Sequence, residues 1–295
     1  MQTATEGVWA PTLTPLTDKF DIDHALLVEH CQLLLGNGCD GIVLFGSTGE
    51  APSFSVLERV AALEALVDGG IARDQIVVGT GCSALPDTVE LTRHATEAGV
   101  LGSLVIPPYF YKGVSDAGVA ALYGSLCETV GSELSLYLYH FPALSMVPIT
   151  VGIIRSIRER FPHNLVGLKD SSGQISNLHG FLKEDELAVL PGTERLMLEG
   201  ARHGGRGVIT ATANISAPII RAVWESRSDP NVNDSNMLAV RSVIEANGTI
   251  PTMKAWIAHS TGYPGWNRVR PPLSVLSTEG ATGTNGQLSE LLSVE

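Results

Sequence analysis

The sequence predicts a (β/α)8 TIM barrel with a C-terminal helical extension. Eight short, apolar, β-rich segments alternate with eight helix-like segments in about the first 225 residues. Strands that alternate with helices form a parallel sheet, and eight such units in this length fit a closed barrel better than an open sheet. A doubly wound open sheet is the alternative, but no G-x-G-x-x-G motif follows the first strand.

The elements can be taken in order along the chain. The expected strands are residues 9–16, 41–47, 76–81, 103–107, 134–141, 165–169, 188–192 and 207–213. Several are apolar without alternation, as expected for strands that are covered on both faces. The expected helices are residues 23–35, 55–67, 86–98, 115–129, 149–160, 175–183, 194–201 and 217–225. Many begin at Ser, Asp or Pro and end at Gly, which matches helix-capping chemistry.

The chain changes character after residue 225. We expect residues 1–225 to form the barrel and residues 226–295 to form a helical appendix packed on it. The appendix contains helical patterns at 231–246 and 252–259, a proline-rich stretch at 268–273 and a short terminal helix.

Composition excludes several classes of partner. The formal net charge is −12, which argues against nucleic acid or an anionic membrane as the main partner, because phosphate binding needs clustered Lys and Arg. Residues 1–6 lack the pattern of a signal peptide, and no apolar stretch is long enough to span a membrane. The four cysteines contain no C-x-x-C pair and are expected to be reduced and buried. A soluble cytoplasmic protein is expected.

Lys169 is the most informative single residue. It follows the apolar run Leu165-Val166-Gly167-Leu168 and precedes the polar turn Asp170-Ser171-Ser172-Gly173. Burial at a strand end is expected to lower the pKa of the ammonium group, and a neutral lysine attacks carbonyl compounds to form a Schiff base. An isolated lysine at a strand end more often reaches to solvent, so the interpretation depends on neighbouring groups.

Two other strand ends carry suitable groups. The turn Gly46-Ser47-Thr48-Gly49-Glu50 offers backbone N–H groups and two hydroxyls that can hold a carboxylate, although it could be an ordinary turn. Tyr139, in the fifth strand, can relay a proton, whereas His140 should point to the opposite face and have a structural role.

Other kinds of catalytic or metal site are not indicated. Glu50, Asp170 and Glu194 could each act as an acid, but no spacing pairs them. The other histidines are scattered without metal-ligand spacing, so no metal site is expected.

These motifs, in this order, resemble the N-acetylneuraminate lyase and dihydrodipicolinate synthase superfamily. The resemblance covers Gly-Ser-Thr-Gly-Glu after the second strand, Tyr-x-x-Pro at the fifth, Gly-x-Lys-Asp at the sixth, Gly-Thr-Glu at 192–194, Gly-Val-Ile at 207–209, Asn214, and Val-Arg-Pro-Pro-Leu at 269–273. It implies a homo-oligomeric barrel, a tetramer or a dimer, whose lysine forms a Schiff base with pyruvate or another 2-oxo acid.

The resemblance also implies site residues. Lys169 would be the Schiff-base lysine and Tyr139 the proton relay, while Ser47, with Gly46 and Thr48, would hold the carboxylate. Ile209, Gly192 and Glu194 would lie near the substrate. No cofactor or metal is implied beyond the covalent Schiff base.

Three departures concern substrate choice and the relay. Dihydrodipicolinate synthases usually carry an arginine shortly after Tyr-x-x-Pro, where this chain has Ala143-Leu144-Ser145. The sugar-binding residues of sialic acid lyases are only partly present, since Arg195 follows Glu194 and Ala211 replaces a serine. Tyr109-Phe110 replaces the usual Phe-Tyr, so the relay tyrosine of a neighbouring subunit is either absent or replaced by Tyr109 or Tyr111.

The sequence therefore predicts a class I lyase that cleaves or forms a 2-oxo-3-deoxy sugar acid, or a related 4-hydroxy-2-oxo acid, from pyruvate and an aldehyde. The alternatives are 4-hydroxy-tetrahydrodipicolinate synthase, a 2-oxo-3-deoxy acid dehydratase, and a barrel that binds a ligand without catalysis.

Overall fold

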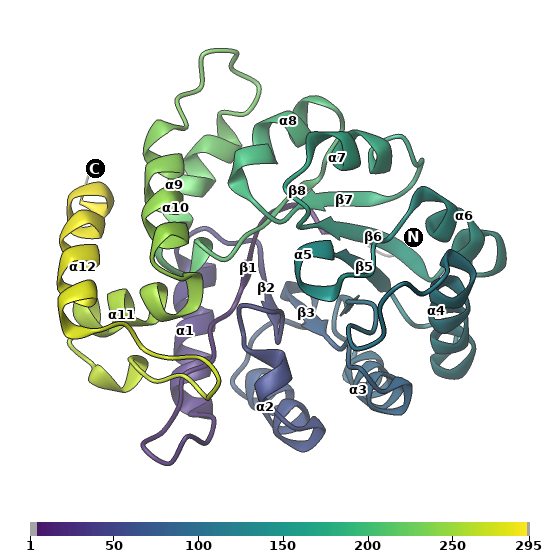
Figure 1. The fold of residues 1–295 in the computed structure, drawn as a ribbon, viewed down its shortest axis with the longest axis horizontal. Helices are drawn as coiled ribbons and strands as arrows, with labels where there is room; N and C mark the ends of the chain where they lie inside the picture. The colour runs from purple at the N-terminus through teal and green to yellow at the C-terminus, as the bar shows by residue number, and fades with distance from the viewer. Residues whose placement is uncertain (1–4, 294–295) are drawn as a thin grey trace. The chain divides into compact units, whose positions relative to one another are not determined.

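A computed structural model describes residues 5–293 and confirms the expected fold class. Eight strands alternate with helices along the chain, and further helices follow the last of them, as in a (β/α)8 barrel with a C-terminal helical extension (Figure 1). Residues 1–4, part of the polar start of the chain, lie outside the described residues. Contacts group the chain into two compact units: residues 5–7 with 72–209, and residues 8–71 with 210–293. The domain boundary expected at residue 225 stays a prediction.

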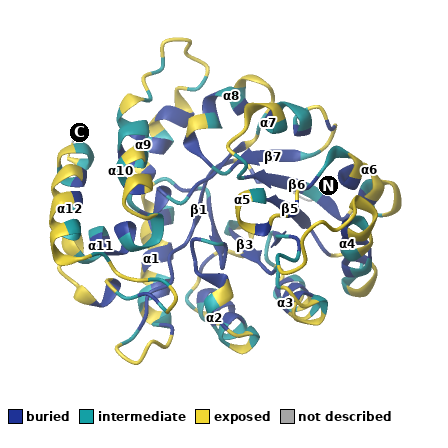
Figure 2. Ribbon diagram, viewed as in Figure 1, coloured by how far each residue is buried: buried dark blue, intermediate teal, exposed yellow. Residues whose placement is uncertain are grey.

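The first unit contains most of the strands. They are β3 (Ile76–Gly79), β4 (Gly102–Val105), β5 (Leu136–His140), β6 (Leu165–Asp170), β7 (Ala188–Pro191) and β8 (Gly207–Ile209). Strands β3 to β7 pair in sequence order, and every pair is parallel. Figure 2 shows these strands as buried along almost their whole length, which explains why their sequences are apolar without alternation.

The same unit contains helices, most of which cover one face of these strands. They are α3 (Leu85–Glu97), α4 (Asp116–Val130), α5 (Pro142–Ser145), α6 (Val151–Arg160), α7 (Ile175–Phe181) and α8 (Met197–Arg202), with 3-10 turns at Arg73–Gln75 and Glu194–Leu196. Leu138 and Leu168 pack with the apolar faces of α4, α6 and α7 in one buried cluster. Ser115 and Thr150 cap α4 and α6 by accepting backbone N–H groups.

The second unit combines the start and the end of the chain. Its strands are β1 (Gly7–Pro11) and β2 (Gly41–Leu44), which pair in parallel. Its helices are α1 (His24–Gly36), α2 (Val56–Asp68), α9 (Ala213–Glu225), α10 (Ser235–Ala246), α11 (Thr249–Thr261) and α12 (Thr278–Leu292), with 3-10 turns at Ala51–Ser53 and Pro264–Trp266. A buried cluster joins α10, α11 and α12 through Val240, Met253 and Leu288.

Several expected boundaries were wrong. The first strand ends at Pro11 rather than at residue 16, and the eighth ends at Ile209 rather than at residue 213. Helix α9 already begins at Ala213, and it is kinked at Ser216, two residues before Pro218, which has no N–H to donate to the helix. The terminal helix is long rather than short, at 15 residues. Cys82 is only partly buried, whereas the other three cysteines are buried as expected.

Candidate functional site

Lys169 and Tyr139 lie side by side on one face of the β5–β6 pair. They are direct partners in the parallel register, and two residues earlier Tyr137 is the partner of Gly167. Side chains two residues apart share a face of a strand, so all three side chains point the same way. The opposite face carries Leu138 and Leu168, which pack against the helices. Lys169 and Tyr139 therefore point away from the helices, as the Schiff-base hypothesis requires.

The amine of Lys169 sits above the ring of Tyr139. Its Nζ lies 4.5 Å from the ring centroid, and the two residues are only 3% and 4% exposed. Across residues 5–293, the Nζ of Lys169 makes no hydrogen bond or ion pair. A buried lysine amine that lacks a carboxylate partner is suited to react with a carbonyl group.

Glycines make room beneath this pair. A side chain at Gly167 would come within 2.5 Å of the Tyr137 ring, and one at Gly102 within 2.7 Å. The hydroxyl of Tyr137 accepts a hydrogen bond from the backbone N–H of Thr5 at 3.1 Å. The ring of Tyr137 thus fills the space over two neighbouring strands and supports the layer that carries Lys169.

The other expected residues of the first unit lie at the ends of β7 and β8. The N–H of Gly192 donates to the carbonyl of Asp170 at 2.6 Å, and a Cβ at Gly192 would clash with the Ser171 side chain, 2.0 Å away. Only glycine fits this close approach. Glu194 and Ile209 are each 1% exposed, and Arg195 is exposed. The structure thus places Gly192, Glu194 and Ile209 at strand ends, where barrel enzymes carry their sites.

His140 and Asp170 occupy the opposite face, as expected for His140. Its Nδ1 accepts a hydrogen bond from the N–H of Ile149 at 3.0 Å, and its Nε2 lies 4.0 Å from the Asp170 carboxylate. Burial lowers the pKa of His140 to about 4 and raises the pKa of Asp170. His140 is therefore a neutral structural residue, and Asp170 helps to shape the turn by accepting the N–H of Ser172 at 2.9 Å.

In the second unit, the turn after β2 has a fixed backbone. Residues Phe45 and Glu50, on either side of it, adopt left-handed conformations with φ of 56° and 58°. The N–H groups of Gly49 and Ala51 both donate to the carbonyl of Gly46, at 3.1 and 3.3 Å. Thr48 is buried, at 7% exposure. Strained backbone of this kind is common in ligand-binding turns, and the role expected for Gly46, Ser47 and Thr48 stays a prediction.

Glu50 belongs to the support of this turn, a role that the sequence did not reveal. Its carboxylate lies 2.5 Å from the Nζ of Lys254, which also donates to the carbonyl of Arg268 at 2.8 Å. The two charged side chains are 0% and 1% exposed. Burial lowers the pKa of Lys254, and the charge of Glu50 acts in the opposite direction. Glu50 therefore anchors the turn to the C-terminal segment.

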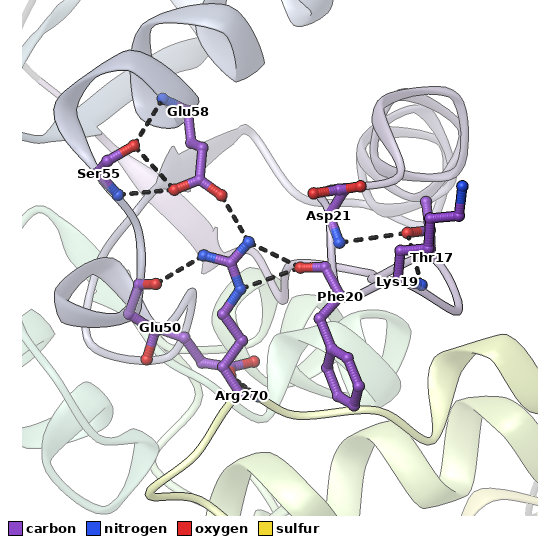
Figure 3. Close-up of polar contacts among 9 residues, drawn as sticks. Thr17, Lys19, Phe20, Asp21, Glu50, Ser55, Glu58 and Arg270 are labelled. Atoms are coloured by element: carbon purple, nitrogen blue, oxygen red, sulfur yellow. Dashed lines mark hydrogen bonds and ion pairs between the residues drawn. The ribbon is translucent and has the colours of Figure 1, made fainter.

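Arg270 adds a second anchor beside the first. Figure 3 shows its guanidinium between the carboxylate of Glu58, 2.5 Å away, and the carbonyl of Phe20, 2.7 Å away. The guanidinium also donates to the carbonyl of Ser53 at 2.8 Å and lowers the pKa of Glu58 to about 2. The Val-Arg-Pro-Pro-Leu motif in the tail thus holds α2 and the turn that precedes it.

Two loops contain the sequence departures noted after the fourth and fifth strands. In the loop after β4, Phe110 and Tyr111 are 74% and 72% exposed. The Nζ of Lys112 in the same loop donates to the backbone carbonyls of Tyr109 and Ser145, the latter at 3.2 Å. A cation from this loop therefore contacts the segment 143–145, which carries no arginine. Leu144, in the middle of that segment, is 54% exposed.

One further cluster of side chains was not evident from residue positions in the sequence. His179 and His203, which looked scattered, lie together with Glu199 on α7 and at the end of α8. The expectation that no metal site exists stays a prediction, because closeness in space alone does not show that an ion binds. Within residues 5–293, no helix is both long and apolar enough to cross a bilayer.

Comparisons with known proteins agree with this architecture. The model of the dihydrodipicolinate synthetase family matches residues 4–291. An uncharacterized DapA-like lyase of Chloroflexus aurantiacus is 32% identical over 92% of each chain. A crystal structure of dihydrodipicolinate synthase from Agrobacterium tumefaciens has a TM-score of 0.91 at 31% identity, covering 97% of this chain and 99% of that one.

N-acetylneuraminate lyase from Aliivibrio salmonicida has the same fold. Its TM-score is 0.90 at 23% identity, with 99% of both chains covered. The expected resemblance to the N-acetylneuraminate lyase and dihydrodipicolinate synthase superfamily is confirmed. The chain therefore belongs to the dihydrodipicolinate synthetase family, a family of lyases.

Proposed function

We propose that the protein is a pyruvate-dependent class I lyase that cleaves, or forms, a 2-oxo-3-deoxy sugar acid or a related 4-hydroxy-2-oxo acid. The observation that carries the proposal is the placement of Lys169 directly opposite Tyr139, with its amine 4.5 Å from the tyrosine ring. An amine for imine formation and a phenol for proton transfer are the two groups that this reaction requires.

The reaction begins with attack of the Lys169 amine on the C2 carbonyl of the substrate. Loss of water gives a protonated imine. Tyr139 removes the proton of the C4 hydroxyl, the C3–C4 bond breaks, and its electrons move into the imine to form an enamine as the aldehyde leaves. Protonation of the enamine at C3 and hydrolysis of the imine release pyruvate and restore the lysine. The protonated imine is the electron sink, so the step requires no metal ion.

The turn after β2 would supply the expected carboxylate site. Ser47 and Thr48 would bind the substrate carboxylate through hydroxyl and backbone N–H groups, and the bonds to the Gly46 carbonyl hold this backbone in advance. Ile209 and Gly192 would line the space for the keto acid. Glu194 would contact the part of the substrate that becomes the aldehyde.

Borohydride trapping tests the proposal. Incubation with pyruvate and borohydride should add one stable mass to the peptide that contains Lys169, because reduction traps the imine. A Lys183→Arg variant, altered at an exposed lysine of the same unit, should be labelled equally. Absence of an adduct, or its attachment to Lys112, Lys183 or Lys254, would overturn the assignment of the nucleophile.

The same chemistry permits two related reactions, the synthesis of 4-hydroxy-tetrahydrodipicolinate and the dehydration of a 2-oxo-3-deoxy acid. A panel of aldehydes incubated with pyruvate, with products identified by mass spectrometry, separates these reactions. A new C–C product with a neutral hydroxyaldehyde supports the proposed reaction, whereas loss of water from a sugar acid without cleavage supports the dehydratase.

The proposal includes a homo-oligomer. The exposed aromatic pair in the loop after β4, Phe110 and Tyr111, with ring centroids 5.4 Å apart, offers an apolar contact for a second copy. Light scattering on the purified chain should give the mass of a dimer or a tetramer, and a monomer would contradict this part of the proposal.

A further inference from the structure

We propose that His179, Glu199 and His203 form a binding site for a transition-metal ion such as Zn²⁺, separate from the residues assigned to the reaction. Helix α7 contributes His179, helix α8 contributes Glu199, and His203 follows the last residue of α8. One ligand atom from each residue lies within 4.8 Å of the other two.

The distances suit a metal ion. The Nε2 of His179 is 2.7 Å and the Nδ1 of His203 is 3.3 Å from the same carboxylate oxygen, Oε1 of Glu199. Zinc binds imidazole and carboxylate ligands at about 2.0–2.2 Å, so ligands in a tetrahedral site stand about 3.4 Å apart. Small rotations of these side chains would bring all three atoms to that separation.

The donor set selects the class of ion. Two imidazoles and one carboxylate suit Zn²⁺, Ni²⁺ and Cu²⁺, whereas Mg²⁺ and Ca²⁺ prefer oxygen ligands alone. The side chains of His179, Glu199 and His203 are 36%, 24% and 50% exposed, so a hydrated ion can reach them and keep water in its remaining positions.

Two neighbouring contacts compete with the ion. The Nδ1 of His203 also lies 3.0 Å from the backbone carbonyl of Glu199, and a metal ion would replace that hydrogen bond. Arg202 lies 3.7 Å from the other carboxylate oxygen of Glu199 and adds positive charge. Both weaken the site, and the ion would also have to replace the 2.7 Å hydrogen bond between Nε2 of His179 and Oε1 of Glu199. Removal of the Arg202 charge should therefore strengthen metal binding.

Metal binding would link two helices that follow neighbouring strands. Helix α7 follows β6, the strand of Lys169, and α8 follows β7, the strand that leads to Gly192. An ion held by both helices would fix them to one another and stabilise this unit against unfolding. The expected role is structural, since the three ligands lie on two helices and directly after one of them, rather than among the residues assigned to imine formation.

Calorimetric titration of the metal-free protein with ZnCl₂ near neutral pH tests the site. We expect one saturable site per chain, and a rise in Tm of about 4–6 °C when free zinc exceeds its Kd a hundredfold. His179→Ala and His203→Ala should each weaken binding by at least about tenfold and abolish the Tm rise.

Two control variants make the test specific. His163→Ala removes an exposed histidine elsewhere in the same unit and should bind zinc like the wild type. Arg202→Ala keeps all three ligands and should bind as tightly or more tightly. The proposal is overturned if the wild-type protein shows no saturable site, or if the His179 and His203 variants bind as well as the His163 control.

Discussion

Lys169 and Tyr139 are register partners on the parallel strands β6 and β5, and the lysine Nζ lies 4.5 Å from the centre of the tyrosine ring. The pairing places an amine and a phenol on the same face at neighbouring strand ends. Because the strands are buried on both sides and Tyr137 packs beneath this layer, neither side chain has much freedom to move away. This arrangement leads to a prediction about the phenol hydroxyl of Tyr139.

Tyr139→Phe keeps the ring beneath the Lys169 amine and removes only the hydroxyl. We expect the variant to fold normally and to lose turnover by about 10²–10⁴, the usual contribution of a general acid or base. Steady-state kinetics with circular dichroism as a folding check would measure this. Tyr137→Phe, two residues earlier on the same face, loses only its bond to Thr5 and serves as the control. Unchanged turnover in the Tyr139 variant would make Tyr139 a packing residue.

The sequence revealed those parts of the site that lie on periodic elements. The apolar run before Lys169 and the motif around Tyr139 each mark a strand end, and strand periodicity is enough to separate the face of Tyr139 from that of His140. The strand boundaries at residues 16 and 213 were wrong because apolar and β-branched residues continue past the last paired residue. A turn with apolar side chains looks like strand in a single sequence.

Contacts between distant residues could not be predicted in this way. Lys254 and Glu50 are 204 positions apart, and nothing in either local pattern indicates a buried ion pair. His179 and Glu199 come from consecutive strand–helix units, and their meeting depends on how α7 and α8 pack. Only the i,i+4 spacing of Glu199 and His203 was available as a signal, and alone it is common on exposed helices.

The buried pair of Lys254 and Glu50 predicts a large effect on stability. Lys254→Met removes the cation and leaves the Glu50 carboxylate buried without its partner, which typically costs about 3–5 kcal/mol. Urea unfolding would measure the loss. The double variant with Glu50→Gln removes both charges and should recover part of it. A single variant as stable as the wild type would show that the pair does not support the turn.

Buried histidines predict a loss of stability in mild acid. Burial lowers the pKa of His30 from 6.5 to about 4, although the hydrogen bond with Asn214 partly offsets this. In the unfolded chain, His30 is therefore protonated below about pH 6.5. In the native protein it is protonated only below about pH 4. Stability should fall by about 3 kcal/mol over that window.

Urea titrations across this pH range would measure the slope. His30→Gln should flatten it, whereas His163→Gln, at an exposed histidine, should not. An unchanged slope in the His30 variant would mean that other groups dominate the acid response, with buried His140 as the next candidate.

Chelation should separate catalysis from metal binding. The proposed reaction uses a protonated imine as its electron sink, so activity should survive EDTA at temperatures well below Tm. The His179→Ala variant should also keep its activity, because this residue lies outside the groups assigned to the reaction. Loss of activity on chelation, with recovery on adding a divalent ion, would instead indicate metal-dependent aldol chemistry and contradict the mechanism.

The last prediction concerns substrate preference and the segment after β5. A second substrate with its own carboxylate, such as aspartate semialdehyde, usually needs a cation to hold that group, and losing such a charge-assisted pair costs about 1.5–3 kcal/mol, or about 10- to 100-fold. Leu144 is exposed in the segment where dihydrodipicolinate synthases usually carry an arginine. The amine of Lys112 already donates to the carbonyls of Tyr109 and Ser145. We therefore predict a higher kcat/KM, with pyruvate, for neutral hydroxyaldehydes than for aspartate semialdehyde.

Two variants test the electrostatic reason for this preference. Leu144→Arg should raise kcat/KM for aspartate semialdehyde by about 10- to 100-fold and leave neutral aldehydes nearly unchanged, because it supplies the missing cation. Lys112→Met should change neither value greatly, since its amine is bound to backbone carbonyls. A wild-type preference for aspartate semialdehyde of tenfold or more would mean that the synthase alternative is correct. If Lys112→Met then removes that preference, Lys112 takes the place of the arginine.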